Sequence, residues 1–179
     1  MENSGNVRPS LVRAAVLAPI FERDGELHLV FIERSGDVPM HRGQVAFPGG
    51  VHRLNDGSFL DTALREAEEE IGLERRCVTI TASLPEVPTM TSGFLIAPFV
   101  GTIPNDYPFE LDPREVASIF FVRLCDLRDP AARQTLRRTL SDGSERDVPT
   151  FVVGERVIWG ATERITTEVL ERSWTIGSR

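Results

Sequence analysis

Apolar residues in the first part of the chain follow the pattern of two β-strands. Residues 12–21 are almost wholly apolar and compatible with a strand, and residues 27–32 form a second such run. Between them, Asp24 and Gly25 are a pair typical of a tight turn. The pattern therefore predicts a β-hairpin near the start of the chain.

Further along, short β-rich runs intermix with stretches of helical periodicity. We expect strands at residues 78–83, 94–101, 117–122, 151–153 and 157–159, and helices at 58–71, 124–127, about 131–140, and 161–172. A short extended piece at 43–47 leads into Pro48, Gly49 and Gly50, where we expect no regular element to continue. This order predicts an α+β, or mixed α/β, fold with a mixed sheet.

The helix at 58–71 has the clearest boundaries. Ser58, with Asp61 three residues later, resembles a capping box, and Gly72 stands where a C-terminal glycine is common. On a helical wheel, one narrow arc is apolar and forms the expected core face: Leu60, Leu64, Ala67 and Ile71.

The same helix carries more carboxylates than its local environment favours. Glu66, Glu69 and Glu70 fall within about 100° of one another on the wheel. At spacings of three and four residues they repel, and they lie in the helix half where the dipole disfavours anions. A bound divalent cation would compensate, because Mg²⁺ prefers oxygen ligands. The alternative from the helix alone is a solvated acidic face, and Glu68 is expected to be such a surface residue.

Composition excludes several chemistries. The chain has 179 residues, a net charge of −7, and no lysine among its 20 basic residues. Without lysine, neither a Schiff base nor a P-loop lysine is available. The acidic balance disfavours duplex nucleic acid as a partner. Cys77 and Cys125 are too few and too far apart for a disulfide framework or a zinc site, so we expect reduced thiols in the cytoplasm.

The length fits one domain, which we place at residues 11–179 after a loose segment at 1–10. No apolar run approaches the length of a membrane span, and the first residues do not resemble a signal peptide. We therefore expect no membrane partner. The oligomeric state stays open, and a homo-oligomer is compatible with the sequence.

One segment of the chain resembles the signature of the Nudix hydrolase family. The stretch from Arg65 to Leu73 reads R-E-A-E-E-E-I-G-L and matches the family's R-E-U-x-E-E-x-G-U at every position, where U is apolar. Its five fixed identities would coincide by chance on the order of once in a million positions. Gly49 and Gly50 stand upstream, at a spacing one residue longer than usual, and Asp56 replaces the usual upstream glutamate.

The longer spacing is similar to the coenzyme A pyrophosphatase branch of that family. That branch carries an upstream element of the form R-S-x3-R-x3-G-x3-F-P-G-G. The chain supplies Arg34-Ser35, Gly43 and residues 47–50 in register, but Pro39 replaces the second arginine. Arg53 stands where the branch often has an acidic residue.

The resemblance implies a mixed sheet between helices and hydrolysis of a diphosphate with Mg²⁺ or Mn²⁺. It implies metal ligands at Glu66 and Glu70, with Glu69 as a third ligand or the base; Arg65 could pair with Glu69. Which glutamate is the base stays open. Gly49 and Gly50 are expected beside the diphosphate. Asp56 is expected to cap the helix, with indirect support of the metal site as the alternative. The cations expected to contact coenzyme A phosphates are Arg34, His41 and Arg42.

The expected partner is therefore a small nucleotide of the coenzyme A class. The closest alternative is another Nudix substrate: ADP-ribose, NADH, a dinucleoside polyphosphate or an oxidised nucleotide. A further alternative is a catalytically silent Nudix domain that senses a nucleotide.

Overall fold

The computed structural model describes residues 11–36, 43–140 and 142–174. The predicted loose segment 1–10 and two predicted phosphate contacts, His41 and Arg42, lie outside these residues. Among the described residues, no helix is long and apolar enough to cross a membrane.

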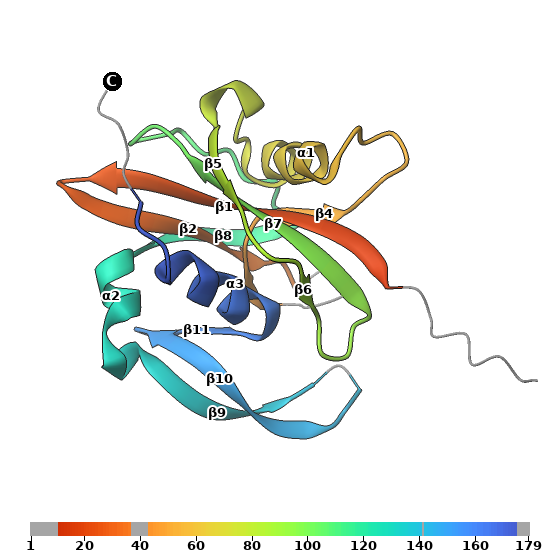
Figure 1. Cartoon of the computed structure of the whole chain (residues 1–179), viewed down its shortest axis with the longest axis vertical. Helices are drawn as coiled ribbons and strands as arrows, with labels where there is room; N and C mark the ends of the chain where they lie inside the picture. The colour runs from red at the N-terminus through yellow and green to blue at the C-terminus, as the bar shows by residue number, and fades with distance from the viewer. Residues whose placement is uncertain (1–10, 37–42, 141, 175–179) are drawn as a thin grey trace, which may run out of the picture.

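A mixed sheet of eight strands forms the centre of the molecule (Figure 1). Its strands are β1 (Val12–Arg23), β2 (Glu26–Arg34), β3 (Val45–Ala46), β4 (Gly49–Val51), β5 (Thr79–Ser83), β6 (Val87–Pro88), β7 (Phe94–Thr102) and β8 (Val116–Arg123). β1 and β2 form the predicted hairpin, and β1 pairs in parallel with β7 along its length. The mixed α+β fold predicted from the sequence is confirmed.

The hairpin of β1 and β2 opens at one end, and this opening positions the site. β1 pairs with β2 only from Ile20 to Arg23, whereas its first half pairs with β4. The second half of β2 pairs with β3 instead. The segment from β3 to β4 therefore fills the gap where the two long strands diverge.

Helices cover both faces of this sheet. The helix α1 (Phe59–Ile71) lies on one face, and α3 (Gly160–Leu170) lies on the other (Figure 1). Beyond α3 is a second sheet of three strands: β9 (Arg133–Thr139), β10 (Glu145–Val153) and β11 (Arg156–Trp159). The remaining elements are the short helix α2 (Leu124–Arg128) and single 3₁₀ turns at Arg75–Cys77 and Pro130–Ala132.

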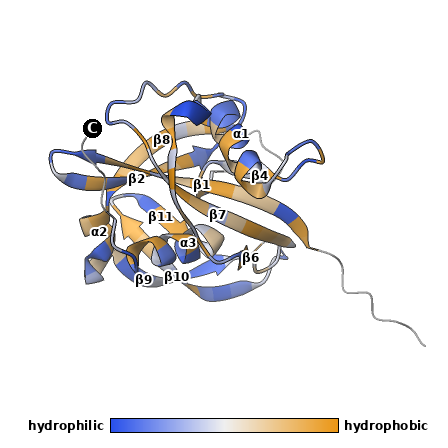
Figure 2. Cartoon of the chain, turned by 45° about the horizontal axis from the view of Figure 1, so that its top comes forward, coloured by the Kyte–Doolittle hydropathy of each residue, from blue (hydrophilic) through white to orange (hydrophobic). Residues whose placement is uncertain are grey.

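Buried apolar residues form two core clusters. One joins α1 to the large sheet through residues such as Leu17, Ala67 and Ile71, and the other packs α3 between the two sheets through Phe151 and Ile165. In Figure 2 the hydrophobic colouring is strong on strands of the large sheet such as β1 and β7, whereas β9 is mainly hydrophilic.

The boundaries of α1 agree with the prediction. The Ser58 hydroxyl accepts a hydrogen bond from the Asp61 backbone N–H, and Gly72 ends the helix in the left-handed conformation at φ 66°. A Cβ at Gly72 would also lie 3.0–3.1 Å from atoms of Glu110. Glycine is therefore favoured here both by its backbone angle and by the space available.

Two predicted features are wrong. The helix expected at about 131–140 is mostly strand β9, because these residues pair with β10 from Arg133 to Thr139. The glycine pair was expected to end regular structure, yet Gly49 and Gly50 begin β4 and pair with Val16 and Ala15. Tertiary pairing outweighs local propensity in both places.

Candidate metal-dependent active site

Two glutamates of α1 turn toward β4. Glu66 is 6% exposed and Glu70 is 1% exposed. The Gly49 backbone N–H donates to Glu70 Oε2 over 2.9 Å. At Gly50, a Cβ would lie 2.6 Å from the Glu66 carboxyl group. Glycine at this position therefore leaves room for the carboxylate.

A third carboxylate, Glu115, completes the cluster. One oxygen each from Glu66, Glu70 and Glu115 lies within 4.8 Å of the others. Glu115 precedes β8, in a turn fastened to the end of α1 by a hydrogen bond of 3.0 Å from the Asp112 N–H to the Glu70 carbonyl. Sequence reasoning missed Glu115, because a single glutamate 45 residues after Glu70 carries no local signal.

Glu69 is brought near this cluster but takes a different place. Its side chain is 43% exposed, and it accepts hydrogen bonds from Arg65 over 3.0 Å and from both Arg53 Nη atoms over 3.2 Å. The pairing of Arg65 with Glu69 was expected. The bond from Arg53 accounts for an arginine that sequence comparison left unexplained. Glu68 is exposed, as predicted.

Asp56 does not cap the helix, contrary to the prediction, because Ser58 does so. Its carboxylate instead accepts two hydrogen bonds from Arg65, over 2.9 and 3.0 Å, and one from the Arg53 backbone N–H. These bonds hold the pKa of Asp56 well below its usual range. Arg65 also donates to Glu66 over 2.5 Å, so Asp56 helps to fix the guanidinium that steadies Glu66.

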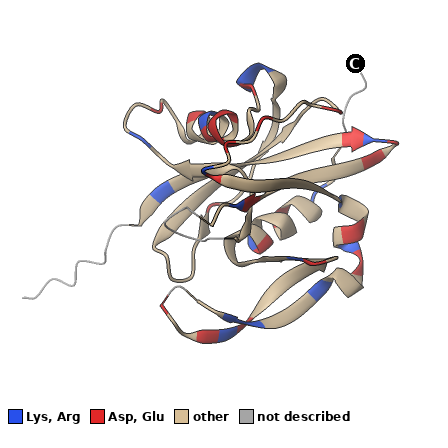
Figure 3. Ribbon diagram, turned by 180° about the vertical axis from the view of Figure 1, so that it is seen from behind, with Lys and Arg blue, Asp and Glu red and all other residues tan. Residues whose placement is uncertain are grey.

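Negative charge exceeds positive charge here. The described carboxylates are Glu66, Glu69, Glu70, Glu115 and Asp56, and the guanidinium groups paired with them belong to Arg34, Arg53 and Arg65. In the ribbon of Figure 3, positions of charged residues occur on α1 and on the segments next to it, as well as elsewhere on the chain. Burial raises the pKa of Glu70 to about 8, and burial also raises that of Glu66. Their arginine and backbone partners therefore offset only part of the cost of burying these two carboxylates.

This donor set fits a hard divalent cation. Oxygen atoms from three converging carboxylates are typical ligands of Mg²⁺ and Mn²⁺, and a dication would offset the excess negative charge. Glu66, Glu70 and Glu115 would hold such an ion. Glu69, which pairs with Arg53 and Arg65, is not part of this group of three carboxylates.

Three of the five predicted substrate residues lie at the acidic site, and the other two, His41 and Arg42, lie outside the described residues. Arg34 joins the site, because its Nη1 lies 3.3 Å from Glu70 Oε1, and Gly49 and Gly50 lie beside the glutamates. Of the chain's two tryptophans, Trp174 packs on the core, and its indole N–H donates to the Val169 carbonyl. Trp159 lies under the Arg138 guanidinium.

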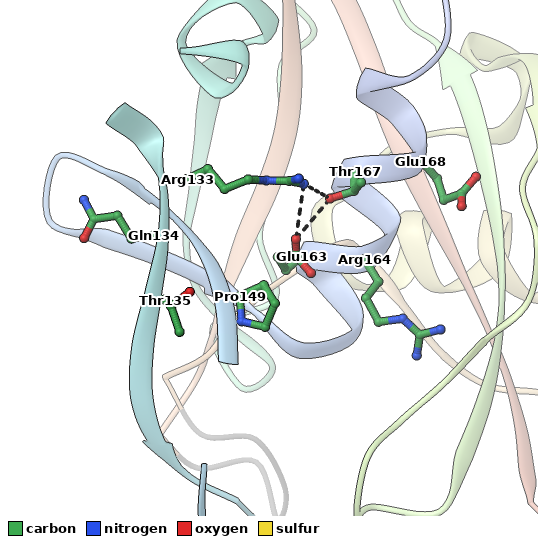
Figure 4. A pocket seen from close by; sticks show the side chains of 8 residues that line it. All are labelled: Arg133, Gln134, Thr135, Pro149, Glu163, Arg164, Thr167 and Glu168. Atoms are coloured by element: carbon green, nitrogen blue, oxygen red, sulfur yellow. Dashed lines mark hydrogen bonds and ion pairs between the residues drawn. The ribbon is translucent and has the colours of Figure 1, made fainter. Parts of the chain in front are cut away.

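An apolar pocket of about 310 Å³ opens beside Arg34, Gly49 and Gly50. A larger and more polar one, of about 550 Å³, lies between β9 and the outer face of α3 (Figure 4). In the larger pocket Arg133 donates to Thr167 and pairs with Glu163, and Thr167 donates to Glu163. Among the described residues, none that the sequence predicts to be functional lines it.

Comparison with known proteins agrees with this geometry. The model of the NUDIX domain matches residues 11–142. A Cronobacter sakazakii protein named "Uncharacterized Nudix hydrolase NudL" is 40% identical over 114 residues, which are 64% of this chain and 58% of that protein. A protein of the same name from Photorhabdus laumondii is 34% identical over 159 residues, or 89% of this chain and 83% of that protein.

Solved structures share the fold at low identity. A MutT/nudix family protein from Enterococcus faecalis aligns with a TM-score of 0.60 and 16% identity, covering 94% of this chain and 63% of the other. A Caenorhabditis elegans Ap4A hydrolase aligns at 0.54 with 19% identity, covering 65% and 82%. The match over residues 11–142, together with the signature from Arg65 to Leu73, shows that the chain belongs to the NUDIX domain family.

Proposed function

We propose that this chain is a hydrolase that cleaves the diphosphate of coenzyme A or its derivatives. The products would be 3′,5′-ADP and 4′-phosphopantetheine, or the acylated form of the latter. The observation that carries the hydrolytic activity is the buried, under-neutralised cluster of Glu66, Glu70 and Glu115 beside Arg34. The coenzyme A assignment is supported by the upstream element from Arg34 to Gly50.

In this reaction the oxygen of a water molecule bonds to one phosphorus, and the bond from that phosphorus to the bridging oxygen breaks. A bound Mg²⁺ or Mn²⁺ ion would neutralise phosphate charge and acidify a water molecule. The water gives up a proton to a carboxylate of the site, and the two phosphate products leave separately. Glu69 and Glu115 both suit this proton transfer, since each is partly exposed.

Arg34 is placed to contact the diphosphate itself. Its guanidinium lies against Glu70, and its side chain is 23% exposed. A guanidinium fork matches phosphate geometry. From the sequence alone, Arg34→Ala is expected to raise KM more for coenzyme A than for 3′-dephospho-coenzyme A. The place of Arg34 beside Glu70 favours contact with the diphosphate instead, so we now expect equal effects on both compounds. A larger effect on coenzyme A would assign Arg34 to the 3′-phosphate instead.

The test is a hydrolysis panel with Mg²⁺ and, separately, Mn²⁺. The compounds are coenzyme A, 3′-dephospho-coenzyme A, ADP-ribose, NADH, diadenosine tetraphosphate and 8-oxo-dGTP, with products separated by chromatography. The highest kcat/KM for coenzyme A, with 3′,5′-ADP as product, is the expected result. A higher value for another compound would keep the hydrolase and overturn its substrate. No cleavage with either metal would favour a silent, nucleotide-sensing domain.

A further inference from the structure

The apolar pocket of about 310 Å³ lies on the α3 side of the large sheet. Three of its residues come from α3, whereas none comes from α1, which carries the acidic cluster from the opposite face. The wall is mainly apolar: Ala14, Val16, Ala46, Phe47, Val51, Phe94, Ile96, Ala161 and Ile165, with Arg34, Gly49, Gly50, Thr89 and Thr162.

Three residues belong both to this pocket and to the acidic site. Gly49 donates its N–H to Glu70, Gly50 faces the Glu66 carboxyl group, and Arg34 pairs with Glu70. All three lie where β1 and β2 diverge. The pocket therefore adjoins the acidic site at these residues, and a diphosphate held at the carboxylates would place one of its two substituents in the pocket.

The pocket offers few hydrogen bonds to that substituent. The Thr162 hydroxyl donates to the Val45 carbonyl over 3.1 Å. The Thr89 hydroxyl accepts from the Phe94 N–H and donates to the Phe94 carbonyl. Arg34 is directed at Glu70. A sugar or a nucleobase would lose hydrogen bonds to water here without replacing them, which is costly, whereas an apolar group would gain by burial.

Building on the proposed diphosphate hydrolysis, we infer that this pocket binds an apolar, branched carbon group attached directly to the diphosphate. Its volume equals that of about ten water molecules at ~30 Å³ each. A neopentyl-type carbon with two methyl groups, as coenzyme A carries next to its diphosphate, has this chemistry. The pocket thus selects the second substituent by apolar contact and disfavours a polyhydroxylated one.

A series of simple ADP esters tests the inference without depending on the rest of coenzyme A. The terminal phosphate carries a methyl, a neopentyl or a 2,3-dihydroxypropyl group. Burial contributes about fourfold for each CH₂, so kcat/KM for the neopentyl ester should exceed that for the methyl ester by at least about 10-fold. The dihydroxypropyl ester should not exceed the methyl ester. Equal values, or a preference for the hydroxylated ester, would overturn the inference.

Two variants of α3 provide a matched pair. Ala161→Leu adds bulk to the pocket, whereas Glu168→Leu changes the outer face of the same helix. Ala161→Leu should remove most of the neopentyl preference and keep cleavage of the methyl ester, and Glu168→Leu should leave both unchanged. If Ala161→Leu fails to fold, the ester series on the natural chain decides.

Cleavage of the methyl ester without a neopentyl preference would overturn the inference about the pocket alone. No cleavage of any ester or of coenzyme A would overturn the proposed function as well.

Discussion

Buried carboxylates lie on both sides of the large sheet, and the two sides differ in how the negative charge is balanced. On the α3 side, Glu163 is 6% exposed and faces the Arg133 guanidinium and the Thr167 hydroxyl. On the α1 side, Glu66 and Glu70 are equally buried and share their space with Glu115.

On the α3 side, the Glu163 carboxylate is paired with a guanidinium group. On the α1 side, carboxylates outnumber the guanidinium groups that pair with them. A buried charge that is paired contributes to the folded structure at little or no net gain. A buried excess of like charge costs stability, and such local conflicts are expected at functional sites. The contrast favours a structural role for Glu163 and agrees with the proposed ligand-binding role of the cluster on α1.

The largest effect is expected from Glu70→Gln. Because metal-ion catalysis contributes several kcal/mol to the transition state, kcat should fall by about 10³-fold or more. The metal-free variant should unfold at the same temperature as the natural chain or higher, since a poorly compensated buried charge is removed. Glu68→Gln, an exposed change on the same helix, is the matched control and should keep full activity. Unchanged kcat in Glu70→Gln would contradict the assignment.

A smaller loss is expected from Glu115→Gln. Glu115 is only partly buried and lies outside the signature from Arg65 to Leu73. We therefore expect kcat/KM to fall by about 10–100-fold, within the range known for residues that tune a metal site. Mn²⁺ binding, followed by electron paramagnetic resonance, should weaken in parallel. If Mn²⁺ affinity is unchanged and kcat alone falls, Glu115 is the base rather than a ligand.

The helix α1 was predictable because its signals are local. The Ser58 cap, the periodic apolar residues and Gly72 all lie within fifteen residues, and the signature from Arg65 to Leu73 overlaps the same segment. The strand β9 was not predictable, because its arginine-rich sequence has no strand preference strong enough to indicate its pairing with β10.

The burial of Glu66 and Glu70 was also not predictable. A helical wheel allows for one buried face, and both glutamates fall outside it. They are covered by β4 and by the turn before β8, which are brought to α1 by the sheet. Glu115 and the apolar pocket depend on the same long-range pairing.

The stability of the fold on the α1 side should depend on pH through Glu70. Burial raises the pKa of Glu70 to about 8 from 4.5, so the folded chain binds more protons than the unfolded chain between these values. The contribution of Glu70 to unfolding free energy is therefore present below pH 4.5 and is lost as pH rises through 8. The urea midpoint of the metal-free protein should fall over this range, and Glu70→Gln should flatten that slope. Equal slopes in both proteins would contradict the prediction.

The smallest effect is expected on the α3 side, from Arg133→Ala. Removing the guanidinium leaves Glu163 buried with the Thr167 hydroxyl as its partner among the described residues, and an uncompensated buried charge destabilises the fold. Because Arg133 is about half exposed, solvent screens the pair, and we expect a loss of about 1–2 kcal/mol in unfolding free energy. The double variant Arg133→Ala, Glu163→Gln should recover part of that loss, since the charge is gone. Activity should stay within about twofold of the natural chain in both variants. A large loss of activity at full stability would mean that the paired carboxylate also serves the site, and the contrast between the two sides of the sheet would no longer separate structure from function.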